Sequence, residues 1–280
     1  RRASSIMKLI LGLWVMSATV FAATCEERFS KSGNPLTGTK YQSSVLVPQL
    51  SVADAIAQLH GIAIARKLDI LTEDAANGSM LLEDRESMRH KPIPYVVSVA
   101  SEGDGATIQI LVKLDTGALA KAEDAKKEIC SILALVKGGD EGKAAAERGA
   151  SATGSNEPRK VDALMLSLEL ARQTKDSAES IPLRYRDKVF TVSGRVKYVM
   201  KDGNAYRVAF DIPEPSDMFL KPGPMDPHFK IDISCVMAVS QSAWSIALRE
   251  REKVKLTGTF LDFDQFKKVM WLGECKPDLR

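Results

Sequence analysis

The chain has 280 residues, of which 45% are hydrophobic and 27% charged, a composition that excludes a largely disordered protein and fits about two globular domains. The formal net charge of +3 is too small to predict a polyanionic partner by itself. The charge is unevenly distributed, with +3 on residues 1–22, −2 on residues 23–137, −2 on residues 138–158 and +4 on residues 159–280.

Residues 1–22 have the layout of a secretory signal peptide. Lys8 precedes an apolar run over residues 9–16, which is too short to cross a bilayer as a permanent helix. Val20 and Ala22 place small residues three positions and one position before a cleavage site, so we expect cleavage after Ala22. The alternative is a buried N-terminal helix.

Export predicts a periplasmic or secreted protein with no membrane-spanning segment in the mature chain. A second possibility is a lipoprotein anchored through Cys25. Lipidation uses a cysteine that follows a small residue, usually Gly, Ala or Ser, whereas Thr24 precedes Cys25 here. We also expect translation to start at Met7, so that residues 1–6 lie before the true start.

All four cysteines follow the predicted cleavage site. An even number of cysteines in an exported protein predicts disulfides, and four cysteines allow three pairings. The chain has no Cys-x-x-Cys motif, so the sequence indicates neither a zinc ribbon nor a thioredoxin-type redox site. The four residues are Cys25, Cys130, Cys235 and Cys275.

Residues 23–137 predict an α+β domain. Ser51 is a suitable cap for a helix over 51–68, and a second helix is expected over 120–137. One strand before the first helix and four after it predict an antiparallel sheet with two helices on one face. The strands are expected over 41–50, 68–74, 78–84, 94–102 and 106–114.

Residues 138–158 form the clearest boundary in the chain. They are rich in Gly, Ala, Ser and Glu, and their apolar residues follow no helical or strand period. Such a composition is typical of a flexible linker, which would separate the α+β domain from a second domain over 159–280.

Residues 159–280 predict an amphipathic helix followed by an all-β unit. The helix is expected over 160–180, and a hairpin over 189–212 turns at Asp202-Gly203-Asn204. A short helix is expected over 240–250. Three strands, a helix and two strands is the element order of the five-stranded OB barrel. The remaining strands are expected over 228–236, 253–260 and 267–275.

This half resembles the tRNA-anticodon-like OB-fold family of small bacterial proteins, many of which are exported. The resemblance covers about residues 160–280 and is carried by LRYRDKVFTVSGRV, FKIDISC, REREKVKLTGTF and WLGEC. It implies an OB barrel and, by fold analogy, nucleic-acid binding. Fold analogy alone is a weak warrant for function.

The OB arrangement also implies a disulfide between Cys235 and Cys275. The third and fifth strands pair in parallel in such a barrel, and each cysteine ends one of these strands after the inward-facing residues, Trp271 among them. The pairing left over is Cys25 with Cys130, which would tie the N-terminal tail to the last helix of the first domain. The alternatives are two buried thiols in the barrel, and a mobile Cys25 beside a core Cys130.

Strand alternation divides the barrel residues into two faces. Aromatic residues such as Phe190, Tyr198 and Phe210 fall with the aliphatic ones and are expected in the core. The outer face therefore has basic charge but lacks the exposed aromatic side chains on which single-strand binders stack bases. The outer cations, which are the candidate anion-binding or nucleic-acid-binding residues, are Arg195, Lys197, Arg207, Lys230 and Lys255.

A long loop over residues 213–228 connects the second and third barrel strands. Loops of this length in compact domains are often functional, and the prolines in this one restrict its conformations. Met218 and Phe219 either anchor a partner or fold back onto the barrel, and we expect the second.

The sequence contains no recognisable catalytic motif. His60, His90 and His228 do not stand at metal-binding spacing with another ligand, and the lone Asp262-x-Asp264 pattern is typical of a solvated turn. We therefore predict no metal, no cofactor and no enzymatic activity; a hydrolase in the first domain would need a pocket with convergent polar groups.

The first functional hypothesis is an exported binding or adaptor protein of the bacterial envelope. Its partner would be a protein or another envelope component rather than a nucleic acid, since an export signal removes the chain from most RNA and DNA. The alternative is an OB-fold protein that binds an oligonucleotide or another anion. The sequence predicts neither the ligand nor the oligomeric state.

Overall fold

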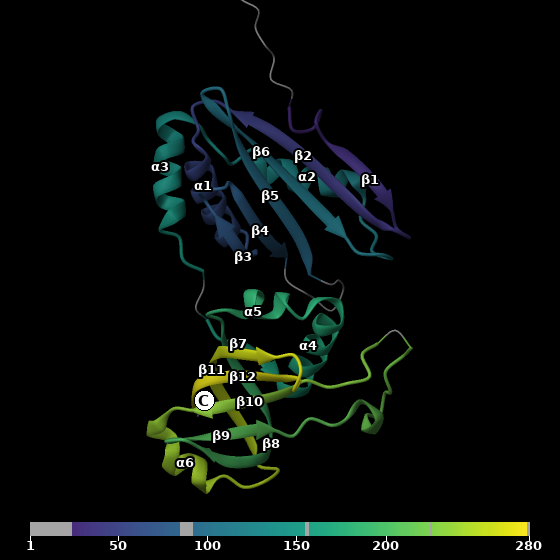
Figure 1. The fold of residues 1–280 in the computed structure, drawn as a ribbon, viewed down its shortest axis with the longest axis vertical. Helices are drawn as coiled ribbons and strands as arrows, with labels where there is room; N and C mark the ends of the chain where they lie inside the picture. The colour runs from purple at the N-terminus through teal and green to yellow at the C-terminus, as the bar shows by residue number, and fades with distance from the viewer. Residues whose placement is uncertain (1–23, 85–91, 155–156, 225, 279–280) are drawn as a thin grey trace, which may run out of the picture.

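The computed structural model describes residues 24–84, 92–154, 157–224 and 226–278. Most of its regular structure lies in two six-stranded sheets, one in each half of the chain, which are called the N-terminal and C-terminal sheets below (Figure 1). The predicted signal peptide over residues 1–22 lies outside the described residues.

The N-terminal sheet is antiparallel throughout, as predicted, with the strand order β1-β2-β6-β5-β4-β3. Alternating residues of its central strands, such as Ile108 and Ile110, are fully buried, because each strand presents every second side chain to the helices. One strand, β1, was not predicted. The strands are β1 (Ser30–Asn34), β2 (Gly38–Val47), β3 (Asp69–Asp74), β4 (Ser79–Asp84), β5 (Ile93–Glu102) and β6 (Gly105–Leu114).

Two predicted helices, α1 (Val52–Ala65) and α2 (Ala122–Leu133), lie behind this sheet in the view of Figure 1. The Ser51 hydroxyl caps α1 by accepting a hydrogen bond of 3.1 Å from the backbone N–H of Asp54. The apolar face of α2 is buried in the same core, with Ile129 and Leu133 almost completely inaccessible. Helix periodicity in the sequence therefore identified both core-facing helices.

The prediction of a flexible linker over residues 138–158 is wrong for most of its length, because residues Gly139–Ala150 form a third helix, α3, packed against α1. The contact is made through backbone rather than through large apolar side chains. A Cβ atom at Gly149 would lie 2.0 Å from the carbonyl oxygen of Ala57. The buried Gln58 side chain adds hydrogen bonds to the backbone of Lys137 and Gly142, with distances of 2.9–3.0 Å. Small residues thus allow α3 to pack against α1 although α3 has no stripe of large apolar side chains.

The C-terminal sheet has the order β11-β12-β10-β9-β8-β7, with an additional pairing between β11 and β8. Pairing therefore runs from β8 through β9, β10, β12 and β11 and returns to β8. The pairs β7–β8 and β10–β12 are parallel, and the other pairs are antiparallel. The strands are β7 (Arg159–Asp162), β8 (Val189–Asp202), β9 (Ala205–Phe210), β10 (Asp232–Met237), β11 (Lys253–Asp264) and β12 (Val269–Pro277).

Two helices pack against this sheet, α4 (Ala163–Ser177) against β7, β8 and β10, and α6 (Ser242–Ala247) against β9. Helix α4 begins after Asp162, whose carboxylate accepts a hydrogen bond of 2.9 Å from the N–H of Leu164. Helix α6 lies between β10 and β11, where a helix was predicted. Strand β7 was predicted as the first turn of a helix, and helix α5 (Ser180–Tyr185) was not predicted.

The Cys235–Cys275 disulfide suggested by the resemblance and the remaining Cys25–Cys130 pair are both present. Cys25 is bonded to Cys130 with a Cα–Cα distance of 5.6 Å, and Cys235 is bonded to Cys275 with a distance of 5.9 Å. Two disulfides are consistent with a periplasmic or extracellular location. The first bond uses the Sγ atom of Cys25, which is the atom that lipidation would modify.

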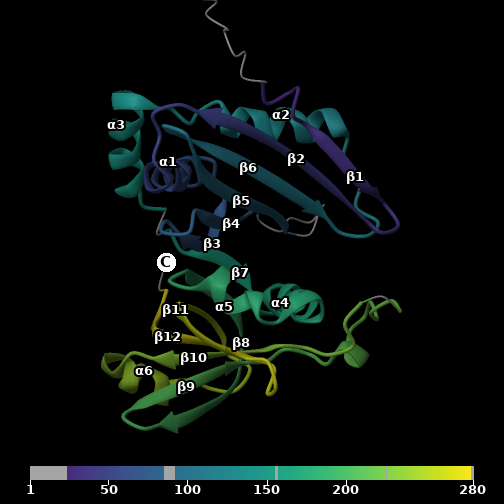
Figure 2. The same ribbon diagram turned by 45° about the horizontal axis from the view of Figure 1, so that its top comes forward.

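The two halves have separate hydrophobic cores and meet at α5. Arg184 on α5 makes a bidentate ion pair with Glu83 on β4, at 2.5 and 2.8 Å, and both side chains are largely buried. Lys188 lies 2.8 Å from Asp69 on β3. Figure 2 shows α5 directly below β3 in a second view. Among the described residues, no helix is both long and apolar enough to cross a bilayer.

Candidate functional site

The five predicted cations do not form one free basic face. The β8–β11 register places Arg195 opposite Lys253 and Lys255 opposite Ser193, and Lys197 is exposed further along β8. Arg207 donates to Asp202 at 2.7 Å, and Lys255 also has an interaction within the chain. The predicted face is therefore partly neutralised by the protein's own groups.

Lys230 is engaged more completely than the other four cations. Its ammonium lies 3.0 Å from Glu214 and 3.3 Å from Asp232, and it donates to the carbonyl of Ile212 at 2.9 Å. Burial would lower the pKa of Lys230, but the two carboxylates raise it above its ordinary value. Lys230 thus ties down the base of the 213–228 loop and is not available to an external anion.

The outer face of β8 and β12 carries aromatic side chains that strand alternation had assigned to the core. Tyr198 is 40% exposed, because the register between β8 and β9 shifts between Val196 and Tyr198 and turns the tyrosine outward. Trp271 points outward between the buried Met270 and Leu272. The prediction that Tyr198 and Trp271 belong to the inner set is therefore wrong, and the outer face does not lack aromatic residues.

These aromatic side chains lie in one row across the sheet. The register places Tyr198 beside Ala209, Ala209 beside Ser234, and Ser234 beside Trp271. Ala209 and Ser234 are almost fully buried although they lie on the outer side, so larger neighbours cover them. The guanidinium of Arg207 lies 4.3 Å from the centroid of the Trp271 ring. We call Tyr198, Met200, Arg207 and Trp271 the aromatic face.

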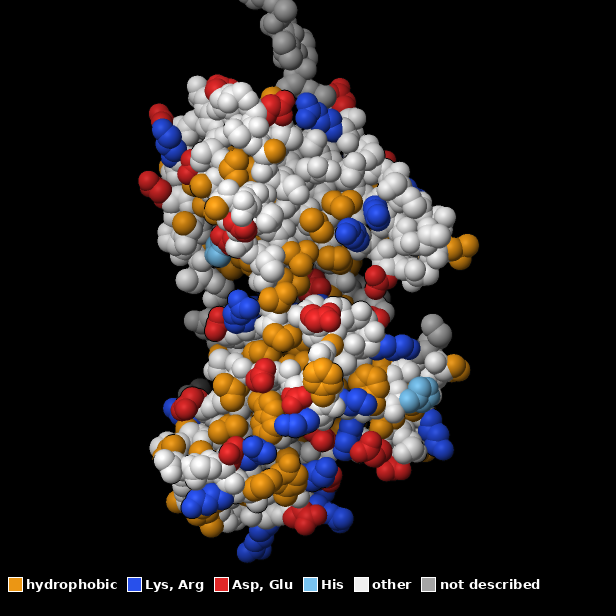
Figure 3. All heavy atoms as spheres, viewed as in Figure 1, with side chains coloured by type: hydrophobic (Ala, Val, Ile, Leu, Met, Phe, Trp, Pro, Cys, Tyr) orange, Lys and Arg blue, Asp and Glu red, His pale blue; other side chains and the backbone are white. Residues whose placement is uncertain are grey.

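The charge around the aromatic face is mixed. Asp202 is bonded to Arg207, and Asp262 lies opposite Trp271 in the β11–β12 register. Figure 3 shows hydrophobic, basic and acidic side chains close together over the C-terminal sheet, without a continuous basic patch on that side of the molecule. The face is suited to a partner that combines apolar and polar groups.

The 213–228 loop projects away from the C-terminal sheet instead of folding back onto it (Figures 1 and 2). Phe219 is 100% exposed and Leu220 is 78% exposed. The prediction that Met218 and Phe219 return to the barrel is therefore wrong for Phe219. The short 3-10 helix Pro215–Asp217 precedes these residues.

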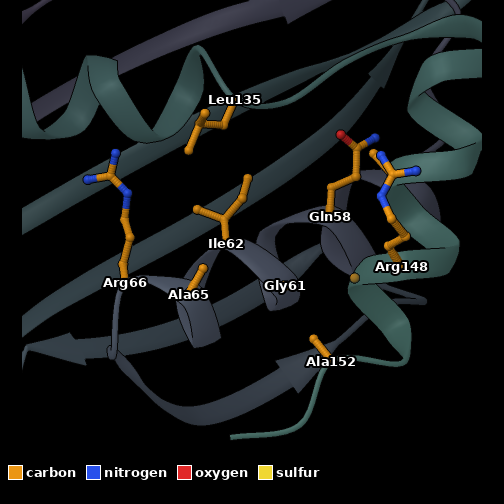
Figure 4. A pocket seen from close by; sticks show the side chains of 10 residues that line it. Gln58, Gly61, Ile62, Ala65, Arg66, Leu135, Arg148 and Ala152 are labelled. Carbon is orange, nitrogen blue, oxygen red and sulfur yellow. The ribbon is translucent and has the colours of Figure 1, made fainter.

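A groove of about 280 Å³ lies between α1, α3 and the end of α2. Figure 4 shows its apolar part, with Ile62, Ala65 and Leu135 between two arginines, Arg66 and Arg148, that stand at opposite sides. Arg66 is bonded to Glu128 at 2.8 Å and to the hydroxyl of Ser131 at 2.9 Å. The groove contains no convergent set of acid, base and nucleophile of the kind that a hydrolase requires.

A buried polar cluster lies beside the C-terminal core. Glu169 on α4 accepts hydrogen bonds from Arg159 at 2.8 Å and from the hydroxyl of Tyr185 at 2.6 Å. Burial would raise the pKa of Glu169, but Arg159 and Tyr185 lower it below its ordinary value; burial and Glu169 raise the pKa of Tyr185. These hydrogen bonds join β7, α4 and α5, and no pattern in the sequence predicts them.

The described part of the chain contains no group of three or more His, Cys, Asp and Glu residues placed to hold a metal ion. His60 lies 2.6 Å from Glu73, and His90 lies outside the described residues. Asp264 accepts hydrogen bonds from the backbone N–H groups of Lys267 and Phe266, which lower its pKa. This geometry is the turn chemistry that the Asp-x-Asp pattern predicted.

The chain matches no family model, and no curated protein matches it. Among solved structures, the crystal structure of Ara h 8.0201 is similar to 40% of this chain and 98% of its own, at 11% identity and a TM-score of 0.25. The crystal structure of fission yeast Pot1 and ssDNA is similar to 90% of this chain and 79% of its own, at 8% identity and a TM-score of 0.19. Likenesses at this level support no conclusion about fold or function.

Proposed function

We propose that this chain is an exported, non-enzymatic binding protein that holds a protein partner on the aromatic face of its C-terminal sheet. The observation that carries the proposal is the stack of Arg207 on Trp271, in one row with the exposed Tyr198. Trp, Tyr and Arg are the residues most enriched at the energetic centres of protein interfaces. The signal-like leader and the two disulfides support export.

The proposal includes an OB-type barrel for the C-terminal half. Two features support it: the strand pairing that returns from β11 to β8, and the position of α6 between β10 and β11, which are the third and fourth of these five strands in chain order. OB barrels commonly bind ligands on the outer face of their second and third strands, which correspond to β9 and β10 here. The aromatic face extends over this area.

Charge favours a protein partner over a polynucleotide. Each phosphate contact requires a cation that is free to replace a counterion. Of the five predicted cations, Arg207 and Lys230 are paired with carboxylates and Lys255 has an interaction of its own. A second candidate function is oligonucleotide binding, which gains support from Tyr198 and Trp271 as possible stacking platforms for bases.

The proposed function is tested by crosslinking in cells. A photoreactive amino acid replaces Tyr198, and a matched variant carries it at Leu119, an 83% exposed apolar position in the other half of the chain. We expect a protein adduct from position 198 that is absent from position 119. An intact mass beginning at residue 23 with four protected cysteines checks export in the same cells.

The crosslinked partner, once identified and purified, is then titrated calorimetrically against Trp271→Ala. We expect the dissociation constant to rise about 30-fold, the effect of losing an interface residue worth about 2 kcal/mol. In parallel, the wild-type protein is titrated with a fluorescent thymidine oligonucleotide. Tight, salt-dependent oligonucleotide binding that is lost in Arg195→Glu/Lys197→Glu, with no adduct at position 198, would replace the proposal with the second candidate.

A further inference from the structure

A second cavity lies between the N-terminal sheet and the start of α2. It has a volume of about 170 Å³ and is bounded by β2, β5 and β6 on one side and by residues between 120 and 128 on the other. Most of its wall is apolar, with Ile93, Val112 and Leu114 from the sheet and Ala125 from α2. It shares no lining residue with the groove between α1 and α3, so it is a separate site.

Two tyrosines line this cavity, and they differ in their hydrogen bonds. The Tyr41 hydroxyl donates to the carbonyl of Ala120 at 2.8 Å. Tyr95 is only 7% exposed, and its hydroxyl makes no hydrogen bond with any residue that the structure describes. Buried hydroxyl groups in folded proteins nearly always have a partner. The Tyr95 hydroxyl is therefore suited to a hydrogen bond with a molecule bound in the cavity.

The Tyr95 hydroxyl keeps its proton at physiological pH. Burial raises its pKa to about 12, and the carboxylates of Glu128 and Asp84 add to the increase, while Arg66 opposes it. A protonated phenolic hydroxyl donates its hydrogen to an acceptor. The cavity thus offers a ligand one buried donor in an otherwise apolar wall.

The charged residues that line the cavity are both acids. Asp124 and Glu128 contribute to the wall, and the described lining residues include no Lys or Arg. Two cations lie near these residues: Arg66 is bonded to Glu128 at 2.8 Å, and the ammonium of Lys31 lies 5.9 Å from the centroid of the Tyr41 ring. The apolar wall disfavours any ion that loses its water, and the two carboxylates disfavour an anion in addition, so a neutral ligand is favoured.

The volume of the cavity limits its ligand to about one ring. An engineered apolar cavity of about 150 Å³ in another protein holds one benzene molecule. The rings of Tyr41 and Tyr95 also favour an aromatic ligand, because aromatic rings pack well edge to face or in offset stacks. Tyr41 already stacks on Phe29 in this way, with the ring centroids 6.0 Å apart.

We propose that this cavity binds a neutral compound made of one aromatic ring with one polar substituent, such as a phenol. The polar atom accepts a hydrogen bond from the Tyr95 hydroxyl, and the ring packs against Ile93, Val112 and Leu114. The N-terminal half thereby has a small-molecule site of its own. This inference uses neither the aromatic face nor its protein partner, so either proposal can fail without the other.

A nuclear magnetic resonance titration of the full mature chain with p-cresol tests the proposal. We expect saturable shifts of backbone amide signals that are concentrated in β5, β6 and α2, with a dissociation constant of about 1 mM or lower. Toluene, which lacks only the hydroxyl, should bind about 3- to 10-fold more weakly. The anion 4-methylbenzoate should bind about tenfold more weakly or worse, because Asp124 and Glu128 repel it.

Tyr95→Phe removes the hydroxyl and keeps the ring. This variant should bind p-cresol and toluene with the same affinity, about 3- to 10-fold below that of the wild type for p-cresol. Tyr206→Phe, which removes a hydroxyl in the C-terminal half, should bind p-cresol like the wild type. Thermal unfolding gives a second measurement: Tyr95→Phe should keep or raise the melting temperature, whereas Tyr41→Phe should lower it because it loses the hydrogen bond to Ala120.

Four results would overturn the proposal. The first is a p-cresol titration whose shifts do not saturate, and the second is a set of shifts that lies outside β5, β6 and α2. The third is a Tyr95→Phe protein that binds p-cresol as tightly as the wild type does. The fourth is tighter binding of 4-methylbenzoate than of p-cresol, which would show that the cavity accepts an anion.

Discussion

Glu169 is a buried acid that is kept charged by its neighbours. Arg159, Tyr185 and Gln173 all direct donor groups at its carboxylate, at distances between 2.5 and 3.3 Å. Burial would favour the neutral acid, but these donors outweigh it and lower the pKa. The ionised carboxylate of this single residue therefore stabilises the folded chain.

We expect the stability contributed by Glu169 to be lost in acid. Its pKa is lower in the folded chain than the ordinary value of 4.5, so the contribution is complete above that pH and falls as the pH decreases below it. Glu169→Gln should lower the free energy of unfolding by about 1–3 kcal/mol at neutral pH and remove this part of the acid dependence. Urea unfolding across a pH series measures both effects.

The control for this prediction is Glu123→Gln, which removes an exposed ion pair with Lys126. Exposed ion pairs contribute about 1 kcal/mol or less to stability, so the free energy of unfolding of the control and its pH dependence should be close to those of the wild type. A Glu169→Gln protein that keeps the wild-type stability and acid dependence would show that the cluster is not a stabilising unit.

At the scale of elements, α3 depends on how closely it approaches α1. A Cβ atom at Gly61 would lie 2.7 Å from the Cα of Gly149, and one at Gly149 would lie 2.0 Å from the oxygen of Ala57. Both contacts are to backbone, which cannot move aside as a flexible side chain can. Gly61 and Gly149 therefore allow α3, which has few large side chains, to pack closely against α1.

Gly149→Ala should separate α3 from α1 and lower the free energy of unfolding by about 1–3 kcal/mol, in spite of the higher helix propensity of alanine. Hydrogen exchange should show faster amide exchange confined to α3. Gly154→Ala is the matched control, because a Cβ there would make an ordinary contact of 3.6 Å with Ile64. Slower exchange in α3 of Gly149→Ala would contradict the packing argument.

At the scale of the molecule, two separate cores are joined by buried charges at α5. Glu83→Gln removes one partner of the Arg184 pair and leaves a guanidinium facing a neutral amide. We expect the free energy of association between the two halves to weaken by about 3–5 kcal/mol. The two halves should then separate, which increases the maximum dimension of the molecule. Small-angle X-ray scattering and urea unfolding measure these changes.

Glu128→Gln provides the comparison for Glu83→Gln. It removes a pair with Arg66 inside the N-terminal half, where the glutamate side chain is 46% exposed. This variant should lower the free energy of unfolding by about 1 kcal/mol or less and leave the scattering profile unchanged. Identical profiles for Glu83→Gln and the wild type would mean that other contacts hold the two halves together.

The sequence by itself determined the elements whose signals are local. Alternating apolar residues located ten of the twelve strands that the structure describes, Ser51 marked the start of α1, and Asp202-Gly203-Asn204 marked the hairpin turn. The even number of cysteines predicted disulfides, and the resemblance to OB proteins suggested the Cys235–Cys275 pair, while the sequence alone left the connectivity open. The strand, helix and turn patterns predict the structure because each depends on residues that are close in the sequence.

Only the tertiary structure decided the features that depend on distant neighbours. A register shift turned Tyr198 outward, and Glu214 from the preceding loop neutralised Lys230. Helix α3 exists because α1 presents a backbone surface that Gly149 can approach. For the aromatic face, the sequence therefore predicted the location on the C-terminal sheet and Arg207 as an outward residue, but not Tyr198 or Trp271, since outward direction, charge pairing and close backbone packing are set by which strands and helices meet in space.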